Sequence, residues 1–169
     1  MATYKLLFLC TGNSARSILG EYLLRHKGGD RFESFSAGAA PKPNPHPIAL
    51  QILKNEYGID ASDAKSESWE VYHDAGLDFV ITVCDNAAES CPIWPGDPIV
   101  GHWQSPDPAH YDGSEEEHYR FFLQVAKQIE ARIDLLLSTE DGQLTGDSGA
   151  VKATLDAIGQ QVTELPELV

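Results

Sequence analysis

The chain has 169 residues, the size of a single domain with a hydrophobic core of its own. It carries 12 Lys and Arg residues against 26 Asp and Glu residues. The resulting net charge of −14 argues against nucleic acid or an anionic membrane surface as the main partner. No apolar run approaches the roughly 18 residues of a membrane span, so we expect neither a span nor a signal peptide. Three cysteines are an odd number for a secreted disulfide scaffold, so we expect a reducing, cytoplasmic environment.

The first 60 residues predict strands and helices in alternation. The dense apolar run 4–9 predicts a strand buried on both faces, and the helical pattern after it ends near residues 28–29. A second short strand is predicted over 32–36. After the proline-rich connection 41–47, a second helix has an apolar face made of Ile48, Ile52, Leu53 and Tyr57.

The alternation continues through the middle of the chain. A brief helix is predicted over 66–73 and a third buried strand over 77–83. The segment 85–113 is rich in Pro, Gly and Asp, with one strand candidate at 99–103, and irregular segments of this length are usually functional or mobile. Ser114 and Glu117 form a capping box that opens a long helix, whose inward face carries Phe122, Val125, Ile129, Ile133 and Leu136.

This order of elements predicts an α/β fold. Strands that alternate with helices form a parallel sheet through right-handed crossovers, so we expect a single domain over 1–138 with a four-stranded parallel sheet flanked by helices. Residues 139–169 form an acidic C-terminal extension with a charge of −5. Its weak amphipathic pattern leaves two alternatives open: a helix docked on the domain or on a partner, and a frayed, flexible tail.

The loop 10–17 carries the chemistry that the sequence predicts. It reads Cys10-Thr11-Gly12-Asn13-Ser14-Ala15-Arg16-Ser17 and joins the end of a strand to the start of a helix. Such a turn directs backbone N–H groups and the positive end of the helix at a tetrahedral oxyanion. We expect Gly12 and Asn13 to adopt the positive φ of a tight nest, and Arg16 to offer a planar fork of donors.

The same field favours a thiolate at Cys10, to which Ser17 can donate its hydroxyl. The alternative is an ordinary buried cysteine at a strand end, since the spacing of Cys10 and Arg16 alone is weak. The strand-to-helix placement, with Gly-Asn inside the loop, favours the nucleophile.

CTGNSARS after an apolar strand resembles the phosphate loop of the low-molecular-weight tyrosine phosphatase fold. That fold is shared by phosphatases and one class of arsenate reductases, and the resemblance covers roughly residues 4–138. It implies that Cys10 is the nucleophile, that Arg16 binds the oxyanion and that a distant aspartate is the general acid. The sequence HW…PDPA matches the acid segment of the family and indicates Asp107 for that role.

Two further cysteines distinguish reduction from hydrolysis. Cys84 ends the third predicted strand, and Cys91 follows after six residues. Parallel strands bring their carboxyl ends to one edge, so we expect Cys84 near the mouth of the Cys10 loop. Hydrolysis of a phosphate ester needs one thiolate, whereas reduction of As(V) to As(III) needs two electrons, which a pair of thiols supplies.

The stretch VCDNAAESCPIWPG resembles the redox segment of thioredoxin-coupled arsenate reductases. The resemblance implies that arsenate is the substrate and thioredoxin the electron donor. It also implies a disulfide relay that passes from Cys10 to Cys84 and then to Cys91.

Three alternatives remain open at this point. In a low-molecular-weight protein tyrosine phosphatase, Cys84 and Cys91 would be incidental, but the aromatic residues usual after the Asp-Pro of such enzymes are replaced by Ala109 and His110. A non-catalytic module would bind an oxyanion without turnover. Zinc held by His102 and the cysteines is disfavoured, because structural zinc sites prefer closer cysteine pairs.

Some relatives bind a monovalent cation such as potassium beside the loop. Asn13, Glu21, Ser36 and Glu67 match those positions, although Glu67 stands where a shorter Asp is usual. The alternative is that Glu21 and Glu67 are ordinary surface acids, and the cation is left open; apart from it we expect no tightly bound cofactor. We expect the side chains of four histidines to be solvated: His46, His73, His110 and His118.

Overall fold

The computed structural model describes residues 3–84, 94 and 98–168. A four-stranded parallel sheet has the order β2-β1-β3-β4, and its strands are β1 (Tyr4–Cys10), β2 (Phe32–Gly38), β3 (Phe79–Thr82) and β4 (Ile99–His102). The predicted α/β fold with four parallel strands is confirmed. β2 is longer than the predicted 32–36, because Ala37 and Gly38 continue the ladder opposite Leu9 and Cys10.

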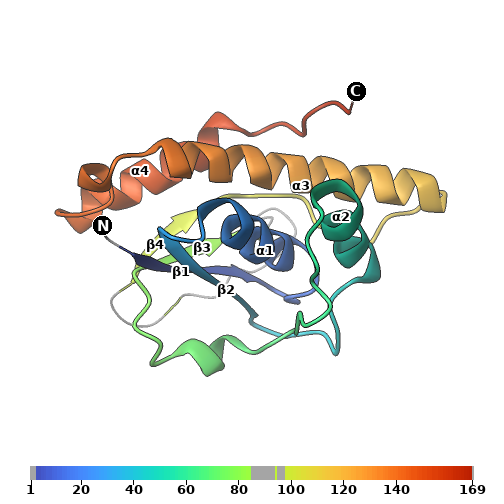
Figure 1. Ribbon diagram of the computed structural model, residues 1–169, viewed down its shortest axis with the longest axis horizontal. Helices are drawn as coiled ribbons and strands as arrows, with labels where there is room; N and C mark the ends of the chain where they lie inside the picture. Colours follow the sequence, from blue (N-terminus) through green and yellow to red (C-terminus); the bar gives the residue numbers. More distant parts are fainter. Residues whose placement is uncertain (1–2, 85–93, 95–97, 169) are drawn as a thin grey trace.

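The helices gather on one face of the sheet (Figure 1). They are α1 (Arg16–Gly28), α2 (Pro47–Tyr57), α3 (Glu115–Ser138) and α4 (Ser148–Gln161). The segment predicted as a brief helix over 66–73 contains a single 3-10 turn, η1 (Trp69–Tyr72), which lies against the opposite face of the sheet; a second turn, η2 (Asp141–Gln143), precedes α4. None of the helices in the described ranges is long and apolar enough to cross a membrane.

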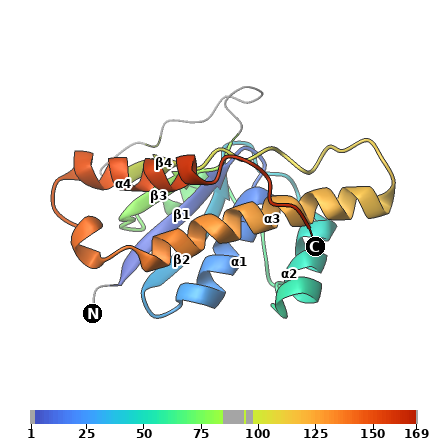
Figure 2. The same ribbon diagram turned by 90° about the horizontal axis from the view of Figure 1, so that it is seen from above.

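The capping box predicted at the start of α3 is present. Ser114 Oγ accepts a hydrogen bond from Glu117 N at 3.1 Å, and the Glu117 carboxylate reaches back to Ser114 N. α3 then crosses above α1, and Figure 2 shows it running diagonally over the sheet. The buried side chains of α3 pack between the helices and the sheet, in the larger of the two hydrophobic clusters.

The core has one part on each face of the sheet. Alternate residues of β1 divide between them: Leu6 and Phe8 face the helices, whereas Leu7 and Leu9 pack with Val80 on the other face. This double burial is why Leu6 to Cys10 of β1 are continuously apolar and do not alternate with polar residues. It places the end of β1, and the loop after it, at the centre of one sheet edge.

The C-terminal extension contains a docked helix. α4 lies beside the edge strand β4 (Figure 2), and Val151, Leu155 and Ile158 are buried in the main core. Of the two alternatives that the sequence left open, the structure therefore has the helix, and it packs on this same chain. The amphipathic spacing was the correct signal, and α4 covers an edge that would otherwise expose β4.

Candidate active site

The loop between β1 and α1 is held from outside by its carbonyl groups. Each carbonyl from residue 10 to residue 14 accepts a hydrogen bond from a neighbouring segment. The donors are the backbone amides of Ala39, Ala40, Lys42 and His46, at 2.8 to 3.2 Å, and the hydroxyl of Ser66, at 2.7 Å. Because the N–H of a peptide unit points opposite to its carbonyl, the loop amides are directed inward, where they can bind an anion.

Asn13 shapes this loop from within. Its φ is 47°, in the left-handed region that a side-chain amide tolerates better than most residues. Its side chain is fully buried: Nδ2 donates to Ser17 Oγ at 2.8 Å, and Oδ1 accepts from Glu67 N at 2.7 Å. Gly12, which was expected to share the positive φ, does not have it. One left-handed residue is sufficient for the turn, because the outside hydrogen bonds hold the rest.

The Cys10 thiol lies at the bottom of the loop with 2% of its surface exposed. Its Sγ is 2.9 Å from Ser17 Oγ, in the contact that the sequence predicted. Ser17 Oγ accepts a hydrogen bond from the Asn13 amide, so its own hydroxyl proton is available for a hydrogen bond to the sulfur. A Cys10 thiolate could only accept that bond. Ser17 and Asn13 thus support the sulfur from beneath the loop.

Arg16 joins the loop to the ends of the two neighbouring strands. Its side chain is 3% exposed, and Nη1 donates to Val83 O at 3.2 Å and to Ser105 O at 3.1 Å. Val83 follows β3, and Ser105 comes shortly after β4. The guanidinium is therefore fixed by carbonyl groups at one edge of the sheet, with Nη2 directed toward Asp107.

Asp107 lies over the same pocket. Its Oδ2 is 3.7 Å from Arg16 Nη2, and its Oδ1 accepts from Ala109 N at 2.9 Å. The carboxyl group is one-third exposed, so it can exchange protons with solvent. A carboxyl group held near the arginine but open to water suits a general acid.

A pocket of about 670 Å³ is lined by Cys10, Arg16, Asp107 and much of the predicted anion loop, but not by Asn13, Ser17 or Cys84. Its lining residues are Cys10, Thr11, Gly12, Ser14, Ala15, Arg16, Ala40, Lys42, Pro106, Asp107, Ala109 and His110. The Lys42 side chain, which sequence reasoning missed, adds a second cation to that of Arg16. The site is therefore locally basic on a chain whose net charge is −14.

The expectation of solvated side chains is wrong for two of the four histidines. His118 is partly buried, and its Nε2 is 2.7 Å from Pro108 O, next to Asp107. His46 caps α2 by accepting from Ile48 N, and burial lowers the pKa of its ring. Pro47 at the first helical position was a signal for the cap. The contact of His118 could not be predicted from the sequence, because it depends on how α3 packs against the segment that carries Asp107.

The register of β1 and β3 places Cys84 close to the start of the anion loop. Leu9 pairs with Thr82, and Val83 N donates to Leu9 O at 2.9 Å, so Cys84 follows immediately beside the loop that begins at Cys10. The Cys84 side chain is fully buried. Cys91, the third predicted redox residue, lies outside the described residues.

The four residues matched to a cation site lie near one another, and several of their oxygens also take part in other hydrogen bonds. Glu21 accepts from Ser36 Oγ at 2.6 Å and pairs with Arg25 at 2.6 Å. Glu67 accepts from Tyr72 at 2.7 Å, and its amide occupies the Asn13 oxygen. These contacts leave the potassium site as a prediction. Within the described ranges, no group of three or more His, Cys, Asp or Glu side chains is placed to hold a metal ion.

Comparison with known proteins identifies the family of the chain. The family described as low molecular weight phosphotyrosine protein phosphatase matches residues 5–147. An arsenate reductase of Shouchella clausii is 39% identical over 133 residues, which are 78% of this chain and 94% of that protein.

Solved structures agree as well. A structure described as an arsenate reductase in the phosphate binding state superposes with a TM-score of 0.65 at 30% identity, covering 80% of this chain and 98% of that one. The thioredoxin-dependent arsenate reductase of Corynebacterium glutamicum superposes at 0.59 with 29% identity, over 80% of this chain; the match spans only 61% of that longer protein. On the extent of these matches, the chain belongs to the low molecular weight phosphotyrosine protein phosphatase family, alongside relatives that are arsenate reductases.

Proposed function

We propose that this protein is an arsenate reductase that uses Cys10, Cys84 and Cys91 as a disulfide relay, with thioredoxin as the electron donor. The observation that carries the proposal is the placement of two buried thiols at the ends of adjoining strands: Cys10 ends β1, and Cys84 follows β3 by two residues. Arg16 supports it further, since its guanidinium binds the carbonyl of Val83, directly before Cys84.

The first step is common to both enzyme classes of the family. The Cys10 thiolate attacks the arsenic atom of arsenate, an S–As(V) bond forms, and the departing oxygen takes a proton from Asp107 and leaves as water. The loop amides, Arg16 and Lys42 neutralise the bound anion. Phosphate has the same shape and charge, so the site should also bind inorganic phosphate.

Reduction occurs in the second step. Cys84 loses its proton and attacks Cys10 Sγ, so that an S–S bond forms and the S–As bond breaks. The electron pair of that bond stays on arsenic, which leaves as arsenite in the As(III) state. Cys91 then attacks Cys84, Cys10 departs as a thiolate, and a dithiol such as reduced thioredoxin reduces the Cys84–Cys91 disulfide.

Coupled turnover tests the proposal. With thioredoxin, thioredoxin reductase and NADPH, we expect arsenate-dependent NADPH oxidation by the wild type and none by Cys10→Ser or Cys84→Ser. Cys91→Ser should release one equivalent of arsenite and then stop, with a Cys10–Cys84 disulfide visible by mass spectrometry. Unchanged turnover in both Cys84→Ser and Cys91→Ser would contradict the relay.

Hydrolysis of an aryl phosphate provides the matched control. It uses Cys10, Arg16 and Asp107 but neither of the other thiols, so Cys84→Ser and Cys91→Ser should retain a weak activity that Cys10→Ser loses. A non-catalytic oxyanion module would instead bind phosphate and lose little in Asp107→Ala. Loss of hydrolysis in Asp107→Ala with phosphate binding intact would exclude that module.

A further inference from the structure

Two buried arginines meet at one serine beside the candidate active site. The backbone carbonyl of Ser105 accepts from Arg16 Nη1 at 3.1 Å, and its hydroxyl oxygen accepts from Arg132 Nη1 at 2.9 Å. The Ser105 hydroxyl donates in turn to Gln128 Oε1 at 3.0 Å. Ser105 and Arg132 are 0% and 1% exposed, so these bonds form away from water. The position of Ser105 therefore couples Arg16 to α3.

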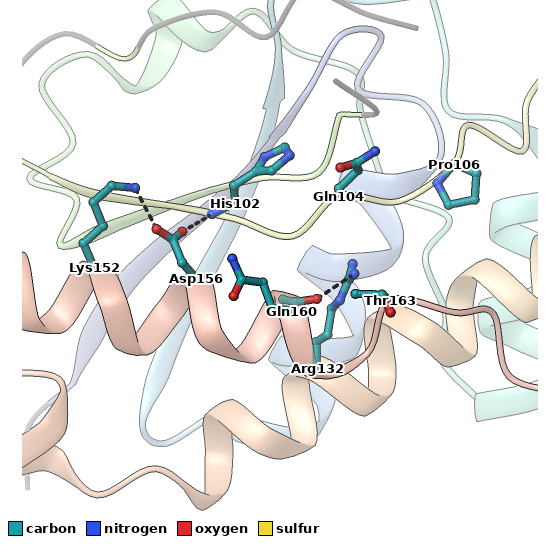
Figure 3. A pocket seen from close by; sticks show the side chains of 9 residues that line it. His102, Gln104, Pro106, Arg132, Lys152, Asp156, Gln160 and Thr163 are labelled. Atoms are coloured by element: carbon teal, nitrogen blue, oxygen red, sulfur yellow. Dashed lines mark hydrogen bonds and ion pairs between the residues drawn. The ribbon is translucent and has the colours of Figure 1, made fainter. Parts of the chain in front are cut away.

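Arg132 also binds the C-terminal extension. Its Nη2 donates to Gly159 O at 3.1 Å and to Val162 O at 2.7 Å, while Gln128 Nε2 donates to Val162 O at 3.2 Å. Figure 3 shows Arg132 reaching from α3 to the end of α4. The family match ends at residue 147, so these acceptors belong to a part of the chain beyond it.

The end of α4 is in turn fixed against β4 and the residue after it. His102 N donates to Asp156 Oδ1 at 2.9 Å, and Trp103 Nε1 donates to Leu155 O at 2.9 Å. Gly159 permits the closest approach, because a Cβ there would lie 2.5 Å from His102 O. These contacts attach α4 to His102 and Trp103, and Trp103 is only two residues before Ser105.

A pocket of about 500 Å³ lies at this junction and shares one wall with the Cys10 pocket. Pro106, which lines both, separates them, and Arg132, Gln104 and Gln160 also line the second one (Figure 3). Burial lowers the pKa of Arg132 to about 10, which leaves it charged at neutral pH. A buried charge that is held by a serine hydroxyl and two backbone carbonyls keeps those groups in place, because losing any of them would leave it poorly solvated.

We propose that Arg132 is a positioning residue that makes the C-terminal extension a working part of the active site. By binding α4 and Ser105 together, it sets the place of the Arg16 guanidinium and of the segment that carries Asp107. This inference rests on the proposed function only for the roles of Arg16 and Asp107. The new element is that the C-terminal extension, which lies beyond the family match, holds Arg16 and Asp107 in place through Arg132 and Ser105, without lining the Cys10 pocket itself.

Three full-length variants test the coupling. Arg132→Gln removes the charge, Ser105→Ala removes only the hydroxyl that Arg132 binds, and Gly159→Ala forces the end of α4 away from His102. We expect each to lower kcat for aryl phosphate hydrolysis and to weaken inhibition by inorganic phosphate, each by on the order of 10-fold, since small displacements of positioned groups have effects of this size or larger. Arg132→Lys should recover part of both.

Gly149→Ala is the matched control, since it changes the same helix at its first turn, where the added Cβ would meet only the Asp147 side chain. It should leave both constants unchanged. Each variant is assayed well below its Tm, with folding verified by circular dichroism. A merely structural role would lower Tm yet leave kcat and phosphate inhibition per folded molecule within about twofold of wild type.

If folded Ser105→Ala and Gly159→Ala both keep wild-type kcat and phosphate inhibition, the inference is overturned, even if Arg132→Gln does not fold. The test needs no arsenate, so failure of the proposed function is seen separately, as phosphate binding and aryl phosphate hydrolysis without arsenate turnover.

Discussion

At the scale of single residues, the site depends on groups that lie behind the pocket as much as on those that line it. Asn13 and Ser17 are fully buried, and they form a chain of hydrogen bonds that ends on the Cys10 sulfur. Hydrogen bonds to a charged acceptor are worth about 1.5–3 kcal/mol, more than neutral ones. The reactivity of Cys10 should therefore be sensitive to a hydroxyl that no substrate touches.

Ser17→Ala tests this dependence. The variant leaves the sulfur without its hydroxyl donor, and we expect alkylation of Cys10 by iodoacetamide to slow by about 10-fold, because the sulfur loses the hydrogen bond that supports its negative charge. Aryl phosphate hydrolysis should fall in parallel. Ser138→Ala, at an exposed site, is the control. Equal alkylation rates in the two variants would show that Ser17 does not stabilise the thiolate.

The partly buried histidines predict a dependence of stability on pH. Burial is the largest cause of the lowered pKa of His46 and of His102, whose ordinary value is 6.5. Below that pH the unfolded chain takes up protons that the folded protein does not, so stability from these groups is complete above about pH 6.5 and is lost as the pH falls below it.

Urea unfolding at pH 7.5 and 5.5 measures this effect. We expect the midpoint to fall at the lower pH and the fall to be smaller in His102→Gln, with the exposed His73→Gln behaving as wild type. An identical fall in His102→Gln would assign the acid sensitivity to other groups.

At the scale of elements, the active loop is shaped by its neighbours at the sheet edge. Connection 39–46 binds its carbonyls, and the ends of β3 and β4 lead to the groups that bind Arg16. The ladder between β1 and β2 continues to Gly38, which lies directly against the loop. The segments at this edge of the sheet therefore contact one another closely, and a small displacement of the end of β2 should also displace the anion-binding loop.

Gly38→Ala is the corresponding prediction. An added Cβ would lie 2.7 Å from Thr11 O and 3.0 Å from Asn13 N, too close to both without movement of the loop backbone. We expect inhibition by inorganic phosphate to weaken by at least about 10-fold, since the loop amides would be displaced from the anion. Gly142→Ala, where an added Cβ meets nothing within 4 Å, should bind phosphate as wild type does. Wild-type affinity in Gly38→Ala would mean that the loop adjusts freely.

At the scale of the whole molecule, the C-terminal extension is part of the same core as the rest of the chain. Leu155 is fully buried beneath α4 and packs against Gly101 of β4. Leu155→Ala should lower the free energy of unfolding by about 2–5 kcal/mol, the usual result of a cavity at a well-packed leucine. Gln161→Ala, exposed at the end of the same helix, should change it little. A single cooperative urea transition is expected in both variants; loss of α4 in a separate early transition would contradict a shared core.

The sequence alone determined the features that depend on local patterns. The apolar run of β1, the capping box at Ser114 and the order of strands and helices predicted the parallel α/β sheet, since strand burial and helix capping are local properties. The loop 10–17 was recognisable because its chemistry lies in consecutive residues. The assignment of Asp107 as the general acid depends on a family resemblance and stays a prediction, although the structure does place Asp107 beside Arg16.

The tertiary structure decided what residues far apart in the chain do to one another. The contacts of Lys42, His118 and Arg132 with the active site could not be predicted, because each joins segments whose relative position depends on how helices pack on the sheet. The same holds for the choice between a docked helix and a tail in residues 148–161. An amphipathic pattern shows that a face can be buried, but only packing determines which surface buries it.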